Sequence, residues 1–225
     1  MKYQKEVLLK DGTKCLLRGA GERDAAEILR CFHLTHAETD YLLTYPEENL
    51  FTEADEAKFL KASEESANAI EIGAFVDGKV VGSAGIEPLG DKEKLRHRAD
   101  FGIAVEKAYW GKGIGRALTL ACIECAKQAG FSQLELEVVA ENAAAVRLYE
   151  AAGFREYGRN PRGFLSRRGW QELVLMRLEL DREKGNVVCR KTGQPVQKTV
   201  YFRSGRALSL PLFCAGGAGN IPHKC

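Results

Sequence analysis

The arrangement of apolar and polar positions predicts three consecutive strands in the middle of the chain. Residues 69–76 and 79–89 are mostly apolar and flank Asp77-Gly78, a pair typical of the type I′ turn that closes a β-hairpin. A charged loop follows, and residues 99–105 then have the length and composition of another strand.

Helical periodicity is found on both sides of these strands. After residue 113 the apolar positions recur at helical spacing on one face: Ile114, Leu118, Ala121, Cys122 and Cys125. Further elements are expected as a hairpin or split strand over 5–19, helices over 22–37 and from Thr52 to about Asn68, a strand over 134–140, a helix opened by Asn142 and two strands after 153. This order predicts an α/β protein with a mixed central sheet of about seven strands and helices on both faces.

A glycine-rich turn joins the strand over 99–105 to the helix that follows. In this turn Gly111, Gly113 and Gly115 alternate with Lys112 and Ile114. Glycine permits backbone conformations that other residues avoid, and it lets a ligand approach the main chain. The free N–H groups and the dipole at a helix start attract anions, and Lys112 and Arg116 add positive charge. The turn is therefore predicted to bind an anion the size of a diphosphate.

The spacing of the turn does not match the common nucleotide-binding motifs. A P-loop needs four residues between its first glycine and Gly-Lys-Ser/Thr, and the sequence has no such string. The dinucleotide fingerprint G-x-G-x-x-G begins at Gly113 and Gly115 but has Leu118 in its last position. An ordinary glycine-rich turn is the alternative interpretation.

Two motifs, about 30 residues apart, narrow the choice of ligand. Residues 110–115 follow the pattern Q/R-x-x-G-x-G/A at the start of a helix, except that Trp110 stands in the Q/R position. Residues 142–154 fit N-x-x-A-x-x-L-Y-x-x-x-G-F without a gap. Together they resemble the GNAT superfamily of acyl-CoA-dependent N-acyltransferases. The resemblance covers roughly residues 5–180, and it implies acetyl-CoA as the acyl donor.

The resemblance also implies where acetyl-CoA binds. Backbone amides of residues 111–116 would hold the diphosphate. In the family two strands splay apart and the pantetheine arm pairs with the freed edge, which here corresponds to residues 103–105, with the Val105 N–H toward the thioester oxygen. Asn142 is expected to cap its helix and to touch the cofactor. The expected cofactor-binding residues are Ile103, Ala104, Val105, Gly111, Lys112, Gly113, Ile114, Gly115, Arg116 and Asn142.

Tyr149 lies where the family has its general acid. A phenol with an ordinary pKa of about 10 is protonated at neutral pH and can give its proton to a departing thiolate. The alternative is an aromatic residue packed in the core.

Glu137 is the expected general base. It lies twelve residues before Tyr149, where family members that acetylate protein N-termini have a glutamate. The alternative is a solvated carboxylate on a strand. Asp100, His97 and ordered water are further candidates for the base.

Composition and charge exclude several other classes of protein. The chain has 225 residues, 45% of them hydrophobic, and a net charge of +2, so it can form one core and gives no overall sign of nucleic-acid binding. Neither a signal peptide nor a run of roughly 20 apolar residues for a membrane helix is present. Cys122 and Cys125 lie on an apolar helix face, which favours core packing over a metal or redox role. We therefore expect a cytoplasmic protein that binds no metal.

The last 45 residues differ in character. Residues 181–225 contain eight Lys or Arg against two Asp or Glu, and no lasting apolar period. We expect a GNAT-like domain over residues 1–180 and a basic, mostly disordered tail over 181–225. The tail is either a silent extension or a segment that binds nucleic acid or a partner.

These observations predict an acetyl-CoA-dependent N-acetyltransferase that acts on a primary amine of a small molecule or peptide. A noncatalytic acyl-CoA-binding or sensing module and a nucleotide-dependent α/β enzyme are the alternatives. The residues after 156 are expected to form a basic loop, which favours an acidic acceptor or is simply solvated: Arg159, Arg162, Arg167 and Arg168. The acceptor and the oligomeric state, including a homodimer, stay open.

Overall fold

The computed structural model describes residues 1–180, which all belong to one compact unit. The expected tail, residues 181–225, lies outside the described residues. The strands are β1 (Gln4–Leu8), β2 (Lys14–Gly19), β3 (Ile70–Val76), β4 (Lys79–Pro88), β5 (Arg98–Val105), β6 (Gln133–Val139), β7 (Arg155–Ser166) and β8 (Gly169–Glu179). They form one sheet in the order β1-β2-β3-β4-β5-β6-β8-β7, to which the predicted N-terminal hairpin contributes two strands.

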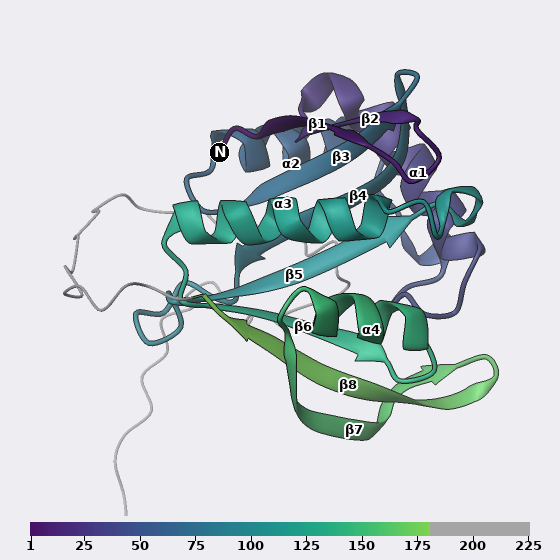
Figure 1. Cartoon of the computed structure of the whole chain (residues 1–225), viewed down its shortest axis with the longest axis vertical. Coiled ribbons are helices and arrows are strands. Elements are labelled where there is room, and N and C mark those ends of the chain that lie inside the picture. The colour runs from purple at the N-terminus through teal and green to yellow at the C-terminus, as the bar shows by residue number, and fades with distance from the viewer. Residues whose placement is uncertain (181–225) are drawn as a thin grey trace, which may run out of the picture. The chain divides into compact units, whose positions relative to one another are not determined.

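Helices cover both faces of this sheet, as predicted (Figure 1). Helices α3 (Ile114–Ala129) and α4 (Ala143–Ala151) lie on the near face in Figure 1, and α1 (Ala25–Ala37) and α2 (Glu53–Glu65) lie behind the sheet. The predicted apolar face of α3 packs on β3, β4 and β5, and Cys122 and Cys125 are fully buried there. The prediction of core packing for these two cysteines is therefore confirmed.

The pairing between β5 and β6 is short. The two parallel strands pair only from Arg98–Asp100 to Gln133–Glu135, although both continue further. At the paired end, the guanidinium of Arg98 binds the carboxylate of Glu135, with one nitrogen–oxygen distance of 2.7 Å. β6 pairs with β8 from Gln133 to Val139 on its other edge, so this pairing does not cover the edge that faces β5. The edge of β5 that faces β6 is therefore open from Phe101 to Val105.

The segment expected to be a long basic loop is mostly a strand. β7 continues to Ser166 and pairs with β8 through two irregularities, one of which lies near Pro161. β7 is an edge strand, where a proline is tolerated because one side of the strand has no ladder to interrupt. Only Arg167 and Arg168 connect β7 to β8, so the prediction of a loop over this segment was wrong.

Candidate active site

Two glycines shape the turn before α3, and a third allows close packing. Gly111 and Gly113 have φ angles of 77° and 101°, in the region that favours glycine. Gly113 is the N-cap of α3, so the free N–H groups of the first helical turn lie at this position. Gly115 is inside the helix, where a Cβ would lie 3.1 Å from Cδ1 of Leu148 on α4. The third glycine therefore brings α4 close to the turn.

The loop between β1 and β2 supports the turn. The Lys10 N–H donates to the carbonyl of Lys112 at 3.1 Å, and Lys112 Nζ lies 3.2 Å from the carboxylate of Asp11. The charge that Lys112 adds is therefore partly balanced, whereas Arg116 is exposed on the first turn of α3.

The open edge of β5 presents main-chain groups in a fixed pattern. The Glu106 N–H donates to the carbonyl of Val81 on the β4 side at 3.0 Å. Because antiparallel pairing directs alternate residues to the same edge, Ala104 also faces β4. The main-chain groups of Ile103 and Val105 face the open side instead. Two of the three residues expected to contact the pantetheine arm thus present their main chain to the opening.

Trp110 links the turn to this edge. Its indole Nε1–H donates to the carbonyl of Val105 at 2.7 Å. The carbonyl of Val105 therefore accepts from the indole, whereas the main-chain N–H of Val105 stays directed toward the opening. The residue in the Q/R position of the motif thus fixes the end of β5 relative to the turn.

Tyr149 lies beside the point where β5 and β6 separate. Its ring packs edge-to-face on Phe101, with the ring centroids 6.0 Å apart, and Phe101 is the first residue of β5 beyond the paired segment. The side chain is 8% exposed, and this burial raises the pKa of the phenol above its ordinary value. Asn142 caps α4, since its side-chain oxygen accepts from the Ala145 N–H at 3.2 Å. Tyr149 is thus held protonated on the α3/α4 face of the sheet.

The candidate bases lie on the α1/α2 face of the sheet or at the closed end of the opening, where β5 and β6 are still paired. Leu136 and Val138 of β6 face the α3 core, so Glu137 between them points to the α1/α2 face, where it is exposed. Asp100 is the last paired residue of β5. His97 precedes β5 at its closed end and is exposed. Glu137 and Tyr149 thus flank the opening from opposite faces, and His97 lies away from it.

The structure adds a carboxylate that the sequence analysis did not single out. Glu87 on β4 is directly opposite Asp100, and Glu71 of β3 lies beside it, over Gly85, where a Cβ would be 2.5 Å from Oε2 of Glu71. Burial, followed by the charges of Asp100 and Glu71, raises the pKa of Glu87 to about 8. The alternation of side chains along each predicted strand places these carboxylates on one face of the sheet. Predicting that they meet also required the register between the three strands, which the sequence does not supply.

The raised pKa of Glu87 predicts a pH-dependent stability. An unfolded Glu87 ionises near its ordinary pKa of 4.5, whereas the folded one, with a pKa of about 8, keeps its proton to higher pH. Its contribution to stability is therefore present below about 4.5 and lost as the pH rises to about 8. The melting temperature of Glu87→Gln minus that of the wild type should therefore increase steadily between pH 5 and pH 8. Exposed Glu65→Gln is the control, and a Glu87→Gln difference that stays constant with pH would contradict the shift.

A pocket of about 270 Å³ opens where β5 and β6 end. It is lined by Glu38–Tyr41 after α1, Lys107 and Trp110 after β5, Glu141 after β6, and residues 166 and 168–171 of the β7–β8 hairpin. The hairpin is tied to the segment after α1, because Arg168 pairs with Asp40 at 2.5 Å and Gln171 donates to the carbonyl of Asp40 at 3.2 Å. Segments far apart in the sequence thus enclose one site next to the open strand edge.

The arginines of β7 and its turn are largely neutralised. Arg167 pairs with Glu47, Arg168 pairs with Asp40, and Arg159 contacts Glu156 and Glu172. The guanidinium of Arg162 lies over the ring of Trp170, 5.4 Å from its centroid. Three of these four arginines are therefore paired with carboxylates, whereas the contact of Arg162 with an aromatic ring leaves its charge in place.

Comparison with known proteins agrees with this geometry. A model of the acetyltransferase (GNAT) family matches residues 32–154. An acetyltransferase of the GNAT family from Streptococcus pneumoniae is 32% identical, with a TM-score of 0.71 over 74% of this chain and 99% of that one. The Salmonella typhimurium protein yncA, solved with its cofactor acetyl-CoA, shares the fold at 22% identity, with a TM-score of 0.68 over 77% of this chain and 98% of that one. The chain belongs to the GNAT acetyltransferase family.

Curated relatives act on different acceptors. The L-methionine sulfoximine/L-methionine sulfone acetyltransferase of Salmonella typhimurium is 27% identical over 113 residues, which are 50% of this chain and 66% of that protein. The ribosomal protein bS18-alanine N-acetyltransferase of Escherichia coli is 38% identical over 80 residues, 36% of this chain and 54% of that protein. The matched segments thus span between about half and two thirds of these relatives.

Residues 1–180 contain neither a metal-binding cluster nor a membrane-spanning helix. Within this part of the chain, no group of three or more His, Cys, Asp or Glu side chains is arranged to hold a metal ion. The helices described there are all too short or too polar to cross a membrane.

Proposed function

We propose that this protein transfers the acetyl group of acetyl-CoA to a primary amine of a small molecule or a peptide. The observation that carries the proposal is the open edge of β5, which lies between the glycine turn of α3 and the buried Tyr149. Residues 1–180 would form the catalytic domain.

The donor would lie along the turn and the open edge. The amides of Gly111, Lys112, Gly113, Ile114, Gly115 and Arg116 would hold the diphosphate, where the free N–H groups and the helix dipole favour negative charge. The main chain of Ile103 would pair with the pantetheine arm, and the Val105 N–H would donate to the thioester oxygen as negative charge develops on it. Asn142, at the cap of α4, would border the same arm.

The catalytic groups would act from the two faces of the opening. Glu137 would accept a proton from the acceptor amine, either directly or through water. The neutral amine nitrogen then attacks the thioester carbon and gives up its second proton to water. The carbon–sulfur bond breaks, the departing sulfur takes a proton from Tyr149, and water returns a proton to the phenolate. Keeping an amine of ordinary pKa about 10.4 neutral at pH 7 costs about 4.6 kcal/mol, which is why a base beside the opening matters. Glu87 and Asp100 are alternative bases on the same face as Glu137.

The acceptor would enter through the pocket at the end of β5 and β6. Its lining includes three carboxylates and two cations, Lys107 and Arg168. Asp40 is paired with Arg168, so Glu38 and Glu141 are the groups that would favour a positively charged amine over an anion. Relatives named as acetyltransferases of L-methionine sulfoximine and of an alanine of ribosomal protein bS18 support acceptors of either size.

Turnover of acetyl-CoA over a panel of amines tests this function. Free-thiol release should rise above acetyl-CoA hydrolysis with at least one member of a panel of amino acids, their amides, peptides with free N-termini, polyamines and aminoglycosides. N-acetylated forms of the same compounds are the matched controls and should give only the background rate. Binding of acetyl-CoA without turnover of any amine would instead indicate a sensing module, and binding of a dinucleotide but not of CoA would indicate a nucleotide-dependent enzyme.

A further inference from the structure

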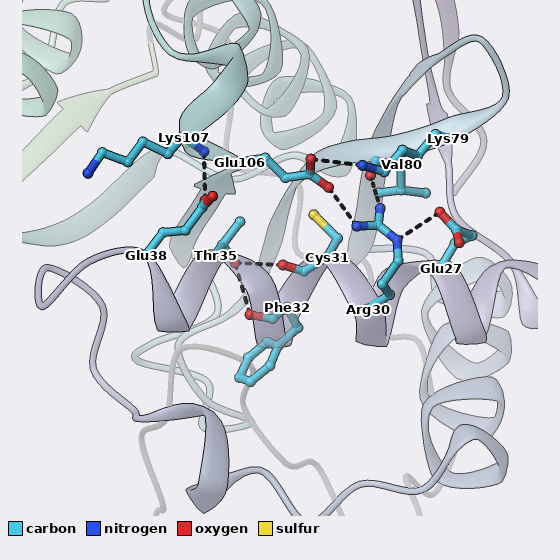
Figure 2. A network of polar contacts seen from close by, with 10 residues as sticks. All are labelled: Glu27, Arg30, Cys31, Phe32, Thr35, Glu38, Lys79, Val80, Glu106 and Lys107. Atoms are coloured by element: carbon cyan, nitrogen blue, oxygen red, sulfur yellow. Dashed lines mark hydrogen bonds and ion pairs between the residues drawn. The ribbon is translucent and has the colours of Figure 1, made fainter.

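A buried carboxylate follows directly after Val105. Glu106 is 2% exposed, and its two oxygens contact different cations. Arg30 Nη1 lies 2.8 Å from Oε1 and Lys79 Nζ lies 3.2 Å from Oε2 (Figure 2). Arg30 comes from α1 and Lys79 from the start of β4. Glu106 therefore attaches the end of β5 to two other elements.

Arg30 is itself fixed in orientation. Its guanidinium donates to Glu27, one turn earlier on α1, at 3.2 Å, and to the carbonyl of Val80 on β4 (Figure 2). With the contact to Glu106, all three nitrogens of this side chain have a named acceptor. An arginine with this many planar contacts holds its partner in one direction as well as at one distance.

A second contact joins the same helix to the same segment of chain. Glu38, the residue after α1, accepts the Lys107 N–H at 2.7 Å (Figure 2). Glu38 and Lys107 also line the pocket. The segment 106–110, which leads from the open strand edge to the glycine turn, is thus attached to α1 at two points.

We propose that Glu106 and Arg30 are positioning residues that hold the end of β5 and the glycine turn ready for acetyl-CoA; the inference rests on the proposed function. A buried ion pair gives little net stability compared with apolar residues of the same size, so stability alone does not account for one here. The pair fixes the direction in which the chain leaves Val105, and hence the N–H of Val105 and the start of the turn. Main-chain groups that are in place before a ligand arrives bind it more tightly, because less ordering remains to be done.

The test is the dissociation constant of acetyl-CoA, measured by calorimetry without an acceptor. Glu106→Gln and Arg30→Met should each weaken binding about fivefold or more. The double variant, Glu106→Gln with Arg30→Met, should bind acetyl-CoA about as weakly as whichever single variant has the lower affinity, because each change breaks the same pair. Lys79→Met should have a smaller effect, since this side chain is 47% exposed.

A second ion pair serves as the matched control. Arg18 on β2 pairs at 2.7 Å with Asp24, the last residue of the short 3-10 helix η1 (Glu22–Asp24), away from the segment 106–110. Arg18→Met should lower the melting temperature and leave the dissociation constant unchanged. An equal loss of affinity in Arg18→Met, or wild-type affinity in a folded Glu106→Gln, would overturn this inference and leave the proposed function standing.

Two milder variants keep the test open if Glu106→Gln does not fold. Glu38→Ala removes only the acceptor of the Lys107 N–H and should weaken acetyl-CoA binding about threefold, as should Lys79→Met. Unchanged affinity in both would overturn the inference. If the wild-type protein does not bind acetyl-CoA, the proposed function fails and this inference fails with it.

Discussion

Replacing Tyr149 with phenylalanine should lower kcat and kcat/KM together by about 100- to 10,000-fold, which corresponds to roughly 3–5 kcal/mol of transition-state stabilisation. Phenylalanine keeps the ring that packs on Phe101 but removes the hydroxyl that would protonate the departing thiolate. Burial raises the pKa of this phenol, so the wild-type acid stays protonated to high pH. The wild-type and variant rate profiles should therefore have the same shape at alkaline pH and differ in height.

Binding and a matched tyrosine distinguish this effect from general damage. The affinity of Tyr149→Phe for acetyl-CoA should change by less than about threefold, because the turn and the strand edge would carry binding. Tyr3→Phe removes a hydroxyl that donates to Glu124 at 3.0 Å, outside the candidate site, and should keep normal rates. Near wild-type kcat in Tyr149→Phe with a good acceptor would mean that water or another group supplies the proton.

Gly113→Asp should weaken acetyl-CoA binding at least about tenfold. The substitution puts a side chain and a negative charge at the N-cap of α3, where the diphosphate should lie. Calorimetry gives the affinity, and a thermal melt shows whether the fold survives. Wild-type affinity in a folded Gly113→Asp would place the diphosphate elsewhere.

Gly113→Asn separates charge from backbone strain. Because φ at this position is 101°, any side chain is strained, and asparagine imposes nearly the same shape as aspartate without the charge. Gly113→Asn should lose less affinity than Gly113→Asp, and the difference should grow at low salt because screening weakens. Equal losses in the two variants at every salt concentration would assign the effect to strain alone.

Features set by neighbouring residues were predictable from the sequence. The turn at Asp77-Gly78, the cap of α4 by Asn142 and the buried face of α3 depend on contacts within a few residues. Local chemistry of this kind also placed Gly113 at the start of α3. The order of these elements sufficed to predict a mixed sheet with helices on both faces.

Features that require distant segments to meet were decided by the tertiary structure. The extension of β7 past Pro161 depends on its place at the edge of the sheet. Glu87 has a raised pKa because folding buries it on β4 and brings Asp100 of β5 and Glu71 of β3 close to it.

The same holds for Glu106, which the sequence shows only as one charged residue after a strand. Arg30 reaches it from α1, 76 positions earlier in the chain. The sequence by itself thus determined the family motifs and the strands and helices that carry them. The partners of its charged side chains were settled only by folding, because the energy of a buried charge depends on which distant groups surround it.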